Sequence, residues 1–582
     1  MKTLYKNYFN IIEKYRNNKL LLLFYISLFV ITVIYISVNA KCKLIIENDV
    51  LIRIKSGIFE NRTNIKHVII PKGVKVIGRE AFDCCFKLES VDIPDTVESI
   101  ENFAFCNCHS LQTIDIPDTV KNIGISAFFI CESLKSVKMP AELQTLGSDA
   151  FSDCIELEKI NIPKGLNKIE SYTFKNCKKL KEVRLQEGIE EIGDEAFLSC
   201  EELSLLELCN GIKKIGSKSF SNCIKLKSVD IPDTVEYIDY NAFYNCLSLH
   251  NIKMSEEIKY VGNKAFEDTA YYNERLLSKE ESIYIGRVLI KHRNIKTKVK
   301  VEEGVRVISE EAFIDNNILL SIDLPKSLIC VGRRAFKNCI NLKEVNLPEN
   351  LENIESEAFS ECNIERIEIP KSVRNIGYAA FKDCKELKEV KMHGTPDTIG
   401  GSAFNNTSWI MNIKPDEYKC RYFQNILLEY FGREKFIKVK EGTRVIAGEV
   451  FRSSEELEKV EFPKSLEYIG YSSFSNCENL KQIIFKEDCN LTVIDTEAFE
   501  DCVSLESPVL PEKLKKVNHM AFCRCKKIEE MKFPESVEYI SNYALSGCVE
   551  LKTIKVPKKM EGKYEFKTTV SIHEINPKII FY

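Results

Sequence analysis

The sequence predicts a mainly β solenoid made of stacked repeats, each about 23 residues long. A phenylalanine, usually preceded by alanine, recurs at this spacing along most of the chain. After each phenylalanine comes a short segment in which apolar and polar residues alternate, as in a half-buried strand. Because so short a unit cannot bury its own apolar face, neighbouring units must stack, and we expect a long, thin core.

The recurring phenylalanine, which we call the landmark, sets the register of the repeat. Most landmarks are 23 residues apart, but two steps of 47 residues interrupt the series. The landmarks are Phe82, Phe105, Phe128, Phe151, Phe174, Phe197, Phe220, Phe243, Phe266, Phe313, Phe336, Phe359, Phe381, Phe404, Phe451, Phe474, Phe499 and Phe522, with Leu545 in the last unit. We expect each of them to fill the space between the two sides of the coil.

Each unit contains a strand and a tight turn. Val91 and Ile93 alternate with polar residues, and Pro94 directly after them ends the strand. Four residues before the landmark most units carry glycine, such as Gly124, or a small polar residue that favours a tight turn. We therefore expect one short parallel strand per unit, with turns and short helical turns between strands, and a spacing of about 4.8 Å between units.

The repeat resembles a known family. Residues 111–131, LQTIDIPDTVKNIGISAFFIC, match the BspA-type leucine-rich repeat at every fixed position, and the resemblance covers about residues 50–560. It implies a leucine-rich-repeat solenoid. Proteins of this family resemble secreted or membrane-attached surface antigens, several of them adhesins for host or extracellular-matrix proteins. The resemblance implies no catalytic residues.

Two breaks in the series divide the repeats. Val288-Leu289-Ile290 in the first break matches Ile426-Leu427-Leu428 in the second, and residues 50–52 look like a third copy. We expect a hairpin-like unit at each of these places, opening three blocks. The expected segments are a basic segment 1–19, a membrane segment 20–38, repeat blocks 44–270, 283–407 and 424–560, irregular inserts 271–282 and 408–423, and a C-terminal cap 561–582.

The segment before the repeats is uncharged and apolar. Residues 20–38, if helical, span roughly 28 Å, about one bilayer core. Basic residues dominate positions 1–19, which predicts a cytoplasmic N-terminus, a single-pass anchor and extracellular repeats. The alternative is a signal peptide cleaved near Ala40, with secretion of the repeats.

Fifteen of the 23 cysteines lie three residues after a landmark, where other units carry threonine, asparagine or serine. This substitution pattern favours a small buried side chain that hydrogen-bonds a turn. A disulfide would not tolerate such replacements, and the cysteine pairs lack accompanying histidines for zinc. We therefore expect no metal and no cofactor.

Composition and motifs exclude other classes of function. A net charge of −4 from 82 basic and 86 acidic residues gives no field suited to nucleic acid. The seven histidines share no motif, and the sequence has no nucleophile elbow, phosphate-binding loop or dinucleotide fingerprint. We do not expect an enzyme, and an unrecognised active site is only a remote alternative.

One candidate binding surface is the column of outward residues between the two apolar residues of each strand. We expect this column on the concave side of the solenoid, where it suits a protein or glycan partner. The alternative is a solvated sheet face. The column consists of Asp92, Asp115, Lys138, Asn161, Arg184, Glu207, Asp230 and Lys253.

A second candidate is the set of aromatic residues near the two breaks, namely Tyr284, Trp409, Tyr418 and Tyr422. Aromatic residues on a protruding loop are good contact anchors. The alternative is that they fold over an irregular unit and pack there.

The sequence thus predicts a cell-surface protein that binds host or matrix proteins through its repeats. The competing hypothesis is a structural protein of the cell envelope that associates with itself.

Overall fold

The computed structural model describes residues 44–47, 50–54, 65–278, 280–561 and 577–582. They fall into two compact units, divided in sequence between Arg287 and Val288. The predicted segments 1–19 and 20–38 and most of the predicted cap lie outside the described residues. Within the described ranges, no helix has the length and apolar character needed to cross a bilayer.

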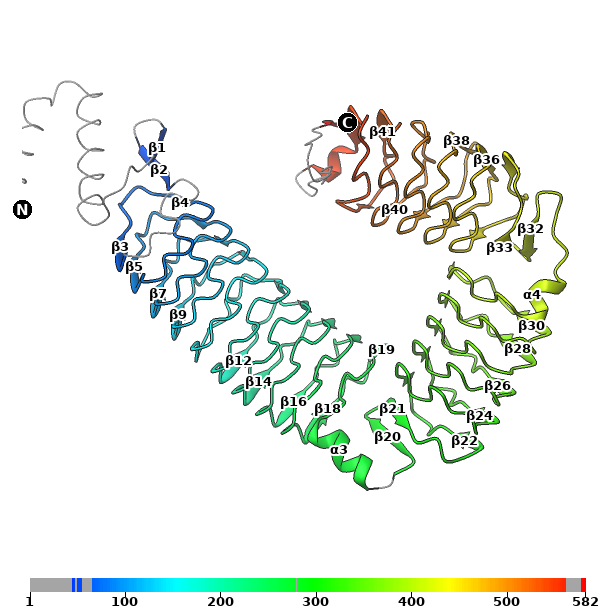
Figure 1. Ribbon diagram of the computed structural model, residues 1–582, viewed down its shortest axis with the longest axis horizontal. Helices are drawn as coiled ribbons and strands as arrows, with labels where there is room; N and C mark the ends of the chain where they lie inside the picture. The colour runs from blue at the N-terminus through cyan, green and yellow to red at the C-terminus, as the bar shows by residue number, and fades with distance from the viewer. Residues whose placement is uncertain (1–43, 48–49, 55–64, 279, 562–576) are drawn as a thin grey trace, which may run out of the picture. The chain divides into compact units, whose positions relative to one another are not determined.

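In the N-terminal unit most rungs contribute two strands, which lie on opposite sides of the coil (Figure 1). We call these sides the long-strand face and the short-strand face. The long strands are β3 (His67–Ile69), β5 (Ser90–Asp92), β7 (Thr113–Asp115), β9 (Ser136–Lys138), β12 (Glu182–Arg184), β14 (Leu205–Glu207), β16 (Ser228–Asp230) and β18 (Asn251–Lys253). The short strands are β4 (Val76–Ile77), β6 (Ser99–Ile100), β8 (Asn122–Ile123), β10 (Thr145–Leu146), β11 (Lys168–Ile169), β13 (Glu191–Ile192), β15 (Lys214–Ile215), β17 (Tyr237–Ile238) and β19 (Tyr260–Val261).

The C-terminal unit repeats this arrangement. Its long strands are β22 (Lys298–Lys300), β24 (Ser321–Asp323), β26 (Glu344–Asn346), β28 (Arg366–Ile369), β30 (Glu389–Met392), β34 (Phe436–Lys438), β36 (Lys459–Phe462), β38 (Gln482–Phe485), β41 (Glu530–Lys532), β43 (Thr553–Val556) and β44 (Lys578–Phe581). Its short strands are β23 (Val307–Ile308), β25 (Cys330–Val331), β27 (Asn353–Ile354), β29 (Asn375–Ile376), β31 (Thr398–Ile399), β35 (Val445–Ile446), β37 (Tyr468–Ile469), β39 (Val493–Ile494), β40 (Lys516–Val517) and β42 (Tyr539–Ile540). A single 3-10 turn, η1 (Lys558–Met560), follows β43.

Strands of successive rungs pair in parallel, one rung apart. In β7 and β9, for example, Ile114 is opposite Val137, and in β6 and β8 Ile100 is opposite Ile123. These inward residues are buried, so each rung contributes to a continuous core. The parallel solenoid is therefore confirmed, but the second strand of each rung was not expected. It occupies the two residues directly before the glycine position, the second of them aliphatic, in a part of the rung where only turns were predicted.

The units at the three places where a hairpin was expected are irregular. At the start of the repeats, strand β1 (Leu44–Glu47) pairs antiparallel with β2 (Val50–Ile54), and at the second break β32 (Cys420–Phe423) pairs antiparallel with β33 (Ile426–Tyr430). At the first break, β20 (Ser282–Ile285) and β21 (Val288–His292) flank Gly286, which has a φ of +55°. The division into three blocks stays a prediction.

Two helices occur near the predicted inserts, α3 (Ala270–Leu277) and α4 (Ser408–Asn412). Each begins directly after a threonine that occupies the position of the repeated cysteine, Thr269 or Thr407. The Oγ1 atom of Thr269 accepts a hydrogen bond from the Tyr272 amide at 3.1 Å, and that of Thr407 accepts one from the Ile410 amide at 3.2 Å. Threonine replaces cysteine here because its hydroxyl caps a helix, which a thiol does poorly.

The landmark phenylalanines form the centre of the core. In the N-terminal unit each ring stacks on the next, as between Phe82 and Phe105, whose centroids are 5.0 Å apart at 5°. In the C-terminal unit Phe336 and Phe359 stack at 5.1 Å and 1°. The stacked landmark rings are buried inside the coil. This confirms that the landmark fills the space between the two sides of the coil.

The cysteines three residues after the landmarks are buried thiols that link adjacent rungs. The Sγ–H group of Cys108 donates to the Phe82 carbonyl at 3.3 Å, and Cys131 does the same to Phe105 at 3.3 Å. Every cysteine of the described ranges is a free thiol. The expected small residue that hydrogen-bonds a turn is confirmed, and the turn is that of the landmark in the preceding rung.

These thiols are expected to resist alkylation in the folded chain. Burial raises the pKa of Cys246 and Cys384 to about 12, so little thiolate forms at about pH 8.5. Iodoacetamide labelling followed by peptide mass spectrometry should modify Cys209, which is partly exposed, before the buried thiols. Denaturant should make all of them reactive. Equal labelling of Cys246 and Cys209 in the folded chain would contradict this picture.

Each rung turns sharply on both sides of its landmark. Residues two before and two after it have left-handed backbone, for example Phe103 and Asn107 with φ values of 60° and 58°. Glycine recurs four residues before the landmark for a different reason from the one expected. Gly124 is not in this conformation, but a Cβ atom there would lie 2.5 Å from the Asn102 amide nitrogen. Glycine is needed for close approach of the rungs and not for the turn.

Ile130 is a strained exception among these left-handed residues. Its φ is 57°, a conformation that a β-branched side chain adopts with difficulty, whereas asparagine tolerates it. Ile130→Asn is therefore expected to raise the free energy of unfolding by about 1 kcal/mol. Urea denaturation would measure the change. The reverse exchange at the equivalent position, Asn107→Ile, should destabilise the chain, and stabilisation by it would refute the explanation.

Candidate binding faces

The column predicted on the strands lies on the long-strand face. Asp92, Asp115, Lys138, Arg184, Glu207, Asp230 and Lys253 are each the last residue of a long strand, and Asn161 is at the same place in a rung without a strand. All eight side chains are exposed. Two neighbouring charges of the column form an ion pair, since Arg184 is 3.1 Å from Glu207. The structure therefore aligns the column on one surface.

The long-strand face was expected on the concave side of the solenoid, but in the C-terminal unit it lies on the outer side of the curve (Figure 1). Figure 1 shows β22, β24 and β26 along the outer edge of this unit's curve, whereas the short strand β40 is on the inner edge. Binding by the column stays a prediction.

Trp409 is not on the surface. It is 7% exposed and packs edge-to-face against Phe404 and Phe423, with both centroid distances 4.9 Å. Helix α4 thus continues the aromatic stack past the last landmark of its series. This burial favours the alternative that the insert folds over an irregular rung.

The other insert aromatics are partly buried. Tyr418 and Tyr422 line one shallow hollow of about 430 Å³, together with Lys440 and Glu441. The Tyr422 hydroxyl accepts a hydrogen bond from the Lys440 amide at 3.3 Å, and burial raises its pKa. Tyr284 is elsewhere, and its carbonyl accepts a hydrogen bond from the Tyr271 hydroxyl at 2.8 Å. The structure therefore brings together only two of the four predicted residues.

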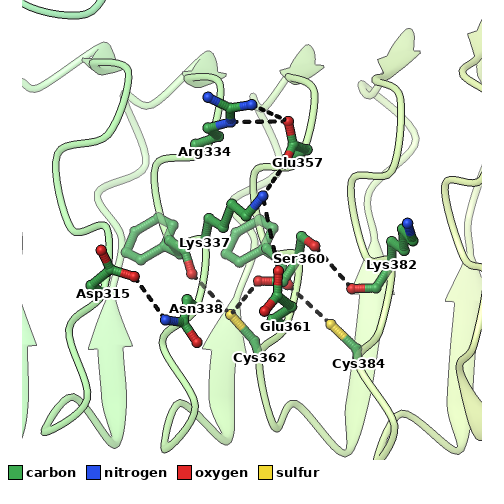
Figure 2. Close-up of polar contacts among 12 residues, drawn as sticks. Asp315, Arg334, Lys337, Asn338, Glu357, Ser360, Glu361, Cys362, Lys382 and Cys384 are labelled. Carbon is green, nitrogen blue, oxygen red and sulfur yellow. Dashed lines mark hydrogen bonds and ion pairs between the residues drawn. The ribbon is translucent and has the colours of Figure 1, made fainter.

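Figure 2 shows that charged side chains around the landmark turns form contacts with side chains of neighbouring rungs. Arg334 Nε donates to Glu357 at 2.9 Å, and Lys337 also contacts this carboxylate. Burial raises the pKa of Glu357, but the hydrogen bonds from Lys337 and Arg334 outweigh it and lower the pKa overall. Asn338 donates to Asp315 at 2.7 Å. We interpret these contacts as structural, because each joins a rung to its neighbour.

The short-strand face carries a set of exposed and half-buried tyrosines that the sequence reasoning missed. They occur at fixed repeat positions, mainly six and three residues before the landmark. The signal is present in the sequence as a recurring tyrosine position. The tyrosines are Tyr237, Tyr240 and Tyr260 in the N-terminal unit and Tyr378, Tyr468, Tyr471 and Tyr539 in the C-terminal unit.

The tyrosines of the N-terminal unit lie on adjacent rungs. Tyr237 of β17 is directly opposite Tyr260 of β19, and Tyr240 follows β17. Tyr237 and Tyr240 are 42% and 44% exposed. Nearby, Lys214 forms an ion pair with Asp239 at 2.9 Å. An aromatic patch with a charged border is a typical contact surface for a protein.

In the C-terminal unit the short-strand face contains a hollow of about 440 Å³. Its lining includes Arg444, Glu467, Tyr468, Asp495 and Asn518. Arg444 donates two hydrogen bonds to the Glu467 carboxylate, from Nε at 2.8 Å and from Nη2 at 2.6 Å. The Tyr468 hydroxyl donates to Asp495, which also accepts from Asn518 at 2.8 Å. Residues in and next to the short strands of four successive rungs therefore form two sets of polar contacts, Arg444 with Glu467, and Tyr468 and Asn518 with Asp495.

This hollow is suited to binding. Burial, followed by the Asp495 charge, raises the pKa of Tyr468, so its hydroxyl stays protonated and acts as a donor. The hydrogen bonds to Glu467 raise the pKa of Arg444, which keeps its charge. Within the described ranges, this hollow included, no group of three histidine, cysteine or carboxylate side chains could hold a metal ion. The two sets of contacts place polar groups beside aromatic surface, which is the composition of a recognition site.

The stacked parallel rungs define a leucine-rich-repeat solenoid. A family model described as the BspA type leucine rich repeat region, in six copies, matches residues 38–155, 98–223, 144–273, 190–319, 306–428 and 441–576. These matches span most of the chain. The chain belongs to the BspA-type leucine-rich-repeat family.

Solved structures with similar repeats come from several bacteria. A leucine-rich repeat protein from Bacteroides ovatus is 20% identical, with 93% of this chain and 90% of that one covered and a TM-score of 0.22. The T. pallidum leucine rich repeat protein is 31% identical over 28% of this chain and 75% of that one, at a TM-score of 0.27. A leucine rich cell surface protein from Faecalibacterium prausnitzii is 22% identical over 76% and 92%, at 0.30. No curated protein matches.

Proposed function

We propose that this chain is a cell-surface protein that binds other proteins, with adhesion to host or matrix proteins as its role. The observation that carries the proposal is the short-strand face, where exposed tyrosines and a polar hollow occur on a rigid ladder. Tyrosine supplies large contact area at low cost in side-chain entropy, and it is enriched among the residues that dominate binding energy. Membership of the family supports the same conclusion.

Display at the surface rests on the N-terminal sequence. Residues 20–38 form an apolar segment behind a basic one, and we propose that they anchor the repeats outside the cell. Cleavage near Ala40 is the alternative, and it would release the same repeats. Under either arrangement the two faces of the solenoid are available to an extracellular partner.

Adherence of cells that carry the full chain tests the proposal. Cells would be applied to immobilised fibronectin, laminin and collagen, beside cells whose chain lacks residues 41–582. We expect dose-dependent adherence that is lost on deletion. Unchanged adherence without the repeats would refute the proposed function.

Substitutions on the two faces then locate the surface. Tyr237→Ala combined with Tyr240→Ala is expected to weaken adherence at least about tenfold, the typical effect of removing binding anchors. The matched control is Asp230→Ala with Lys253→Ala, which removes two exposed residues of the long-strand face, one in the same rung and one in the next. Greater loss with the control pair would assign binding to the long-strand column instead.

A further inference from the structure

One rung of the C-terminal unit lacks its long strand. The sheet β34-β36-β38 ends at β38, and the next long-strand sheet begins at β41. Between them Pro508 stands where the repeat calls for an aliphatic residue, three positions after the buried Leu505. Proline has no amide hydrogen and cannot pair in the middle of a sheet. The long-strand face is therefore interrupted at residues 506–510.

The interrupted segment is drawn toward the following rung. The Ser507 hydroxyl accepts hydrogen bonds from the amides of Glu529 and Glu530, at 3.1 and 3.0 Å. Toward the preceding rung, the backbone bond made by this segment is the one from the Glu506 amide to the Lys481 carbonyl, at 3.0 Å. Strand pairing is therefore lost on both sides of the segment, but beside β41 the Ser507 hydroxyl replaces it, and the gap lies on the β38 side, as a hollow between residues 481–489 and 506–513.

The gap leaves an open strand edge. In other rungs the amide equivalent to that of Phe485 donates to the next rung, as Val439 does to Glu461 and Phe533 to Lys555, both at 2.9 Å. Within the described ranges, Phe485 has no such backbone bond to residues 506–510. Because alternate residues of a strand face the same neighbour, the Ile483 carbonyl is directed to the same side. An acceptor and a donor two residues apart suit one added strand.

The hollow, of about 620 Å³, adjoins this edge, and its lining includes apolar side chains. Ile484 of β38 is 39% exposed and Val509 is 85% exposed. Alternate side chains of an added strand would reach these two residues. The volume is sufficient for a few residues of extended chain.

The charged side chains around the hollow differ in whether they have a polar partner. Lys481 is paired with Glu458 at 2.7 Å, Lys486 with Glu441, and Lys513 donates to Asn490 at 2.7 Å. Three carboxylates that line the hollow form no ion pair within the described ranges, namely Glu487, Glu506 and Glu512. The lining carries four carboxylates, Glu487, Asp488, Glu506 and Glu512, against three lysines, and this small excess of negative charge complements a basic occupant.

We infer that this gap binds an extended peptide segment with basic side chains, which adds to the free edge of β38 as a strand. The inference deepens the proposed protein-binding function and rests on it. The segment belongs to a partner protein, since its main chain supplies the hydrogen bonds and its lysine or arginine side chains meet the carboxylates of the lining.

Fluorescence polarisation with the full-length chain tests the inference. The probe is a labelled, acetylated hexapeptide of alternating lysine and valine. Two controls have the same length: one is N-methylated at alternate residues, which removes strand hydrogen bonds, and the other carries glutamate in place of lysine. We expect the basic probe to bind at least about tenfold more tightly than either control. Equal binding of the N-methylated probe would overturn strand addition.

Two sets of variants locate the site. Pro508→Ile restores the repeat residue and is expected to close the ladder, protect the Phe485 amide from hydrogen exchange and abolish probe binding. Glu506→Gln with Glu512→Gln leaves the backbone intact and is expected to weaken the basic probe about tenfold. Its matched control is Glu456→Gln with Glu478→Gln, two exposed carboxylates outside the hollow. Equal effects of both pairs would overturn the assignment.

The outcomes separate this inference from the proposed function. If the deletion of residues 41–582 abolishes adherence but the probe does not bind, the peptide site is wrong and the adhesive function stands. Self-association of the full chain that Pro508→Ile abolishes would show that a second copy occupies the edge, which also overturns the inference.

Discussion

Phe197→Ala is expected to lower the free energy of unfolding by about 3–5 kcal/mol, the usual cost of removing a fully buried phenylalanine. The Phe197 ring stacks between Phe174 and Phe220, with centroid distances of 5.2 and 5.3 Å. Alanine would leave a cavity in the middle of a narrow coil, where both neighbours lose contact. Urea denaturation of the purified chain would measure the change, and hydrogen exchange would localise it to the adjacent rungs.

The matched control is Phe197→Leu. Leucine fills the same position in the last unit, where Leu545 is buried. We expect this variant to cost much less, because most of the volume is retained. If alanine and leucine destabilise the chain equally, stacking and volume at the landmark do not hold the rungs together.

Gly377→Ala is expected to have the second large effect, a loss of about 1–3 kcal/mol. A Cβ atom there would lie 2.3 Å from the Ser356 amide nitrogen and 2.6 Å from the Glu355 carbonyl carbon. Both atoms belong to the backbone of the preceding rung and cannot move aside as a flexible side chain does. Thermal denaturation would report the change.

Asp239→Ala provides the comparison, since Asp239 is at the equivalent repeat position and already has a Cβ atom. Its loss removes only a partly exposed ion pair with Lys214, which contributes at most about 1 kcal/mol. A larger effect at Asp239 than at Gly377 would show that the close approach of rungs is not the reason for glycine.

Much of the core follows from the sequence because the repeat leaves it little choice. The spacing of the landmarks fixes which ring stacks on which, and the replacement of cysteine by threonine or serine indicated a small buried side chain. The short strands could not be predicted from alternation, since two residues such as Ser99 and Ile100 are too few for a pattern. Their pairing comes from stacking and not from local preference.

The candidate site was harder to predict. The sequence left Trp409 as either a surface anchor or a residue packed over an irregular unit, and only the structure shows that it packs on the last landmark of its series, Phe404. The tyrosines of the short-strand face were visible as a repeat position, yet that face had no strand in the predicted fold. Pro508 breaks the repeat pattern in the sequence. The sequence could not show that the Ser507 hydroxyl would bond to the following rung and leave a gap.

We propose that the repeats are displayed outside the cell as a binding surface. Protease treatment of intact cells, combined with N-terminal sequencing of the full-length protein, tests this proposal most directly. We expect repeat peptides to be released from intact cells while the N-terminal residues of the chain stay with the cells. Complete protection of the repeats until the cells are lysed would contradict the proposal.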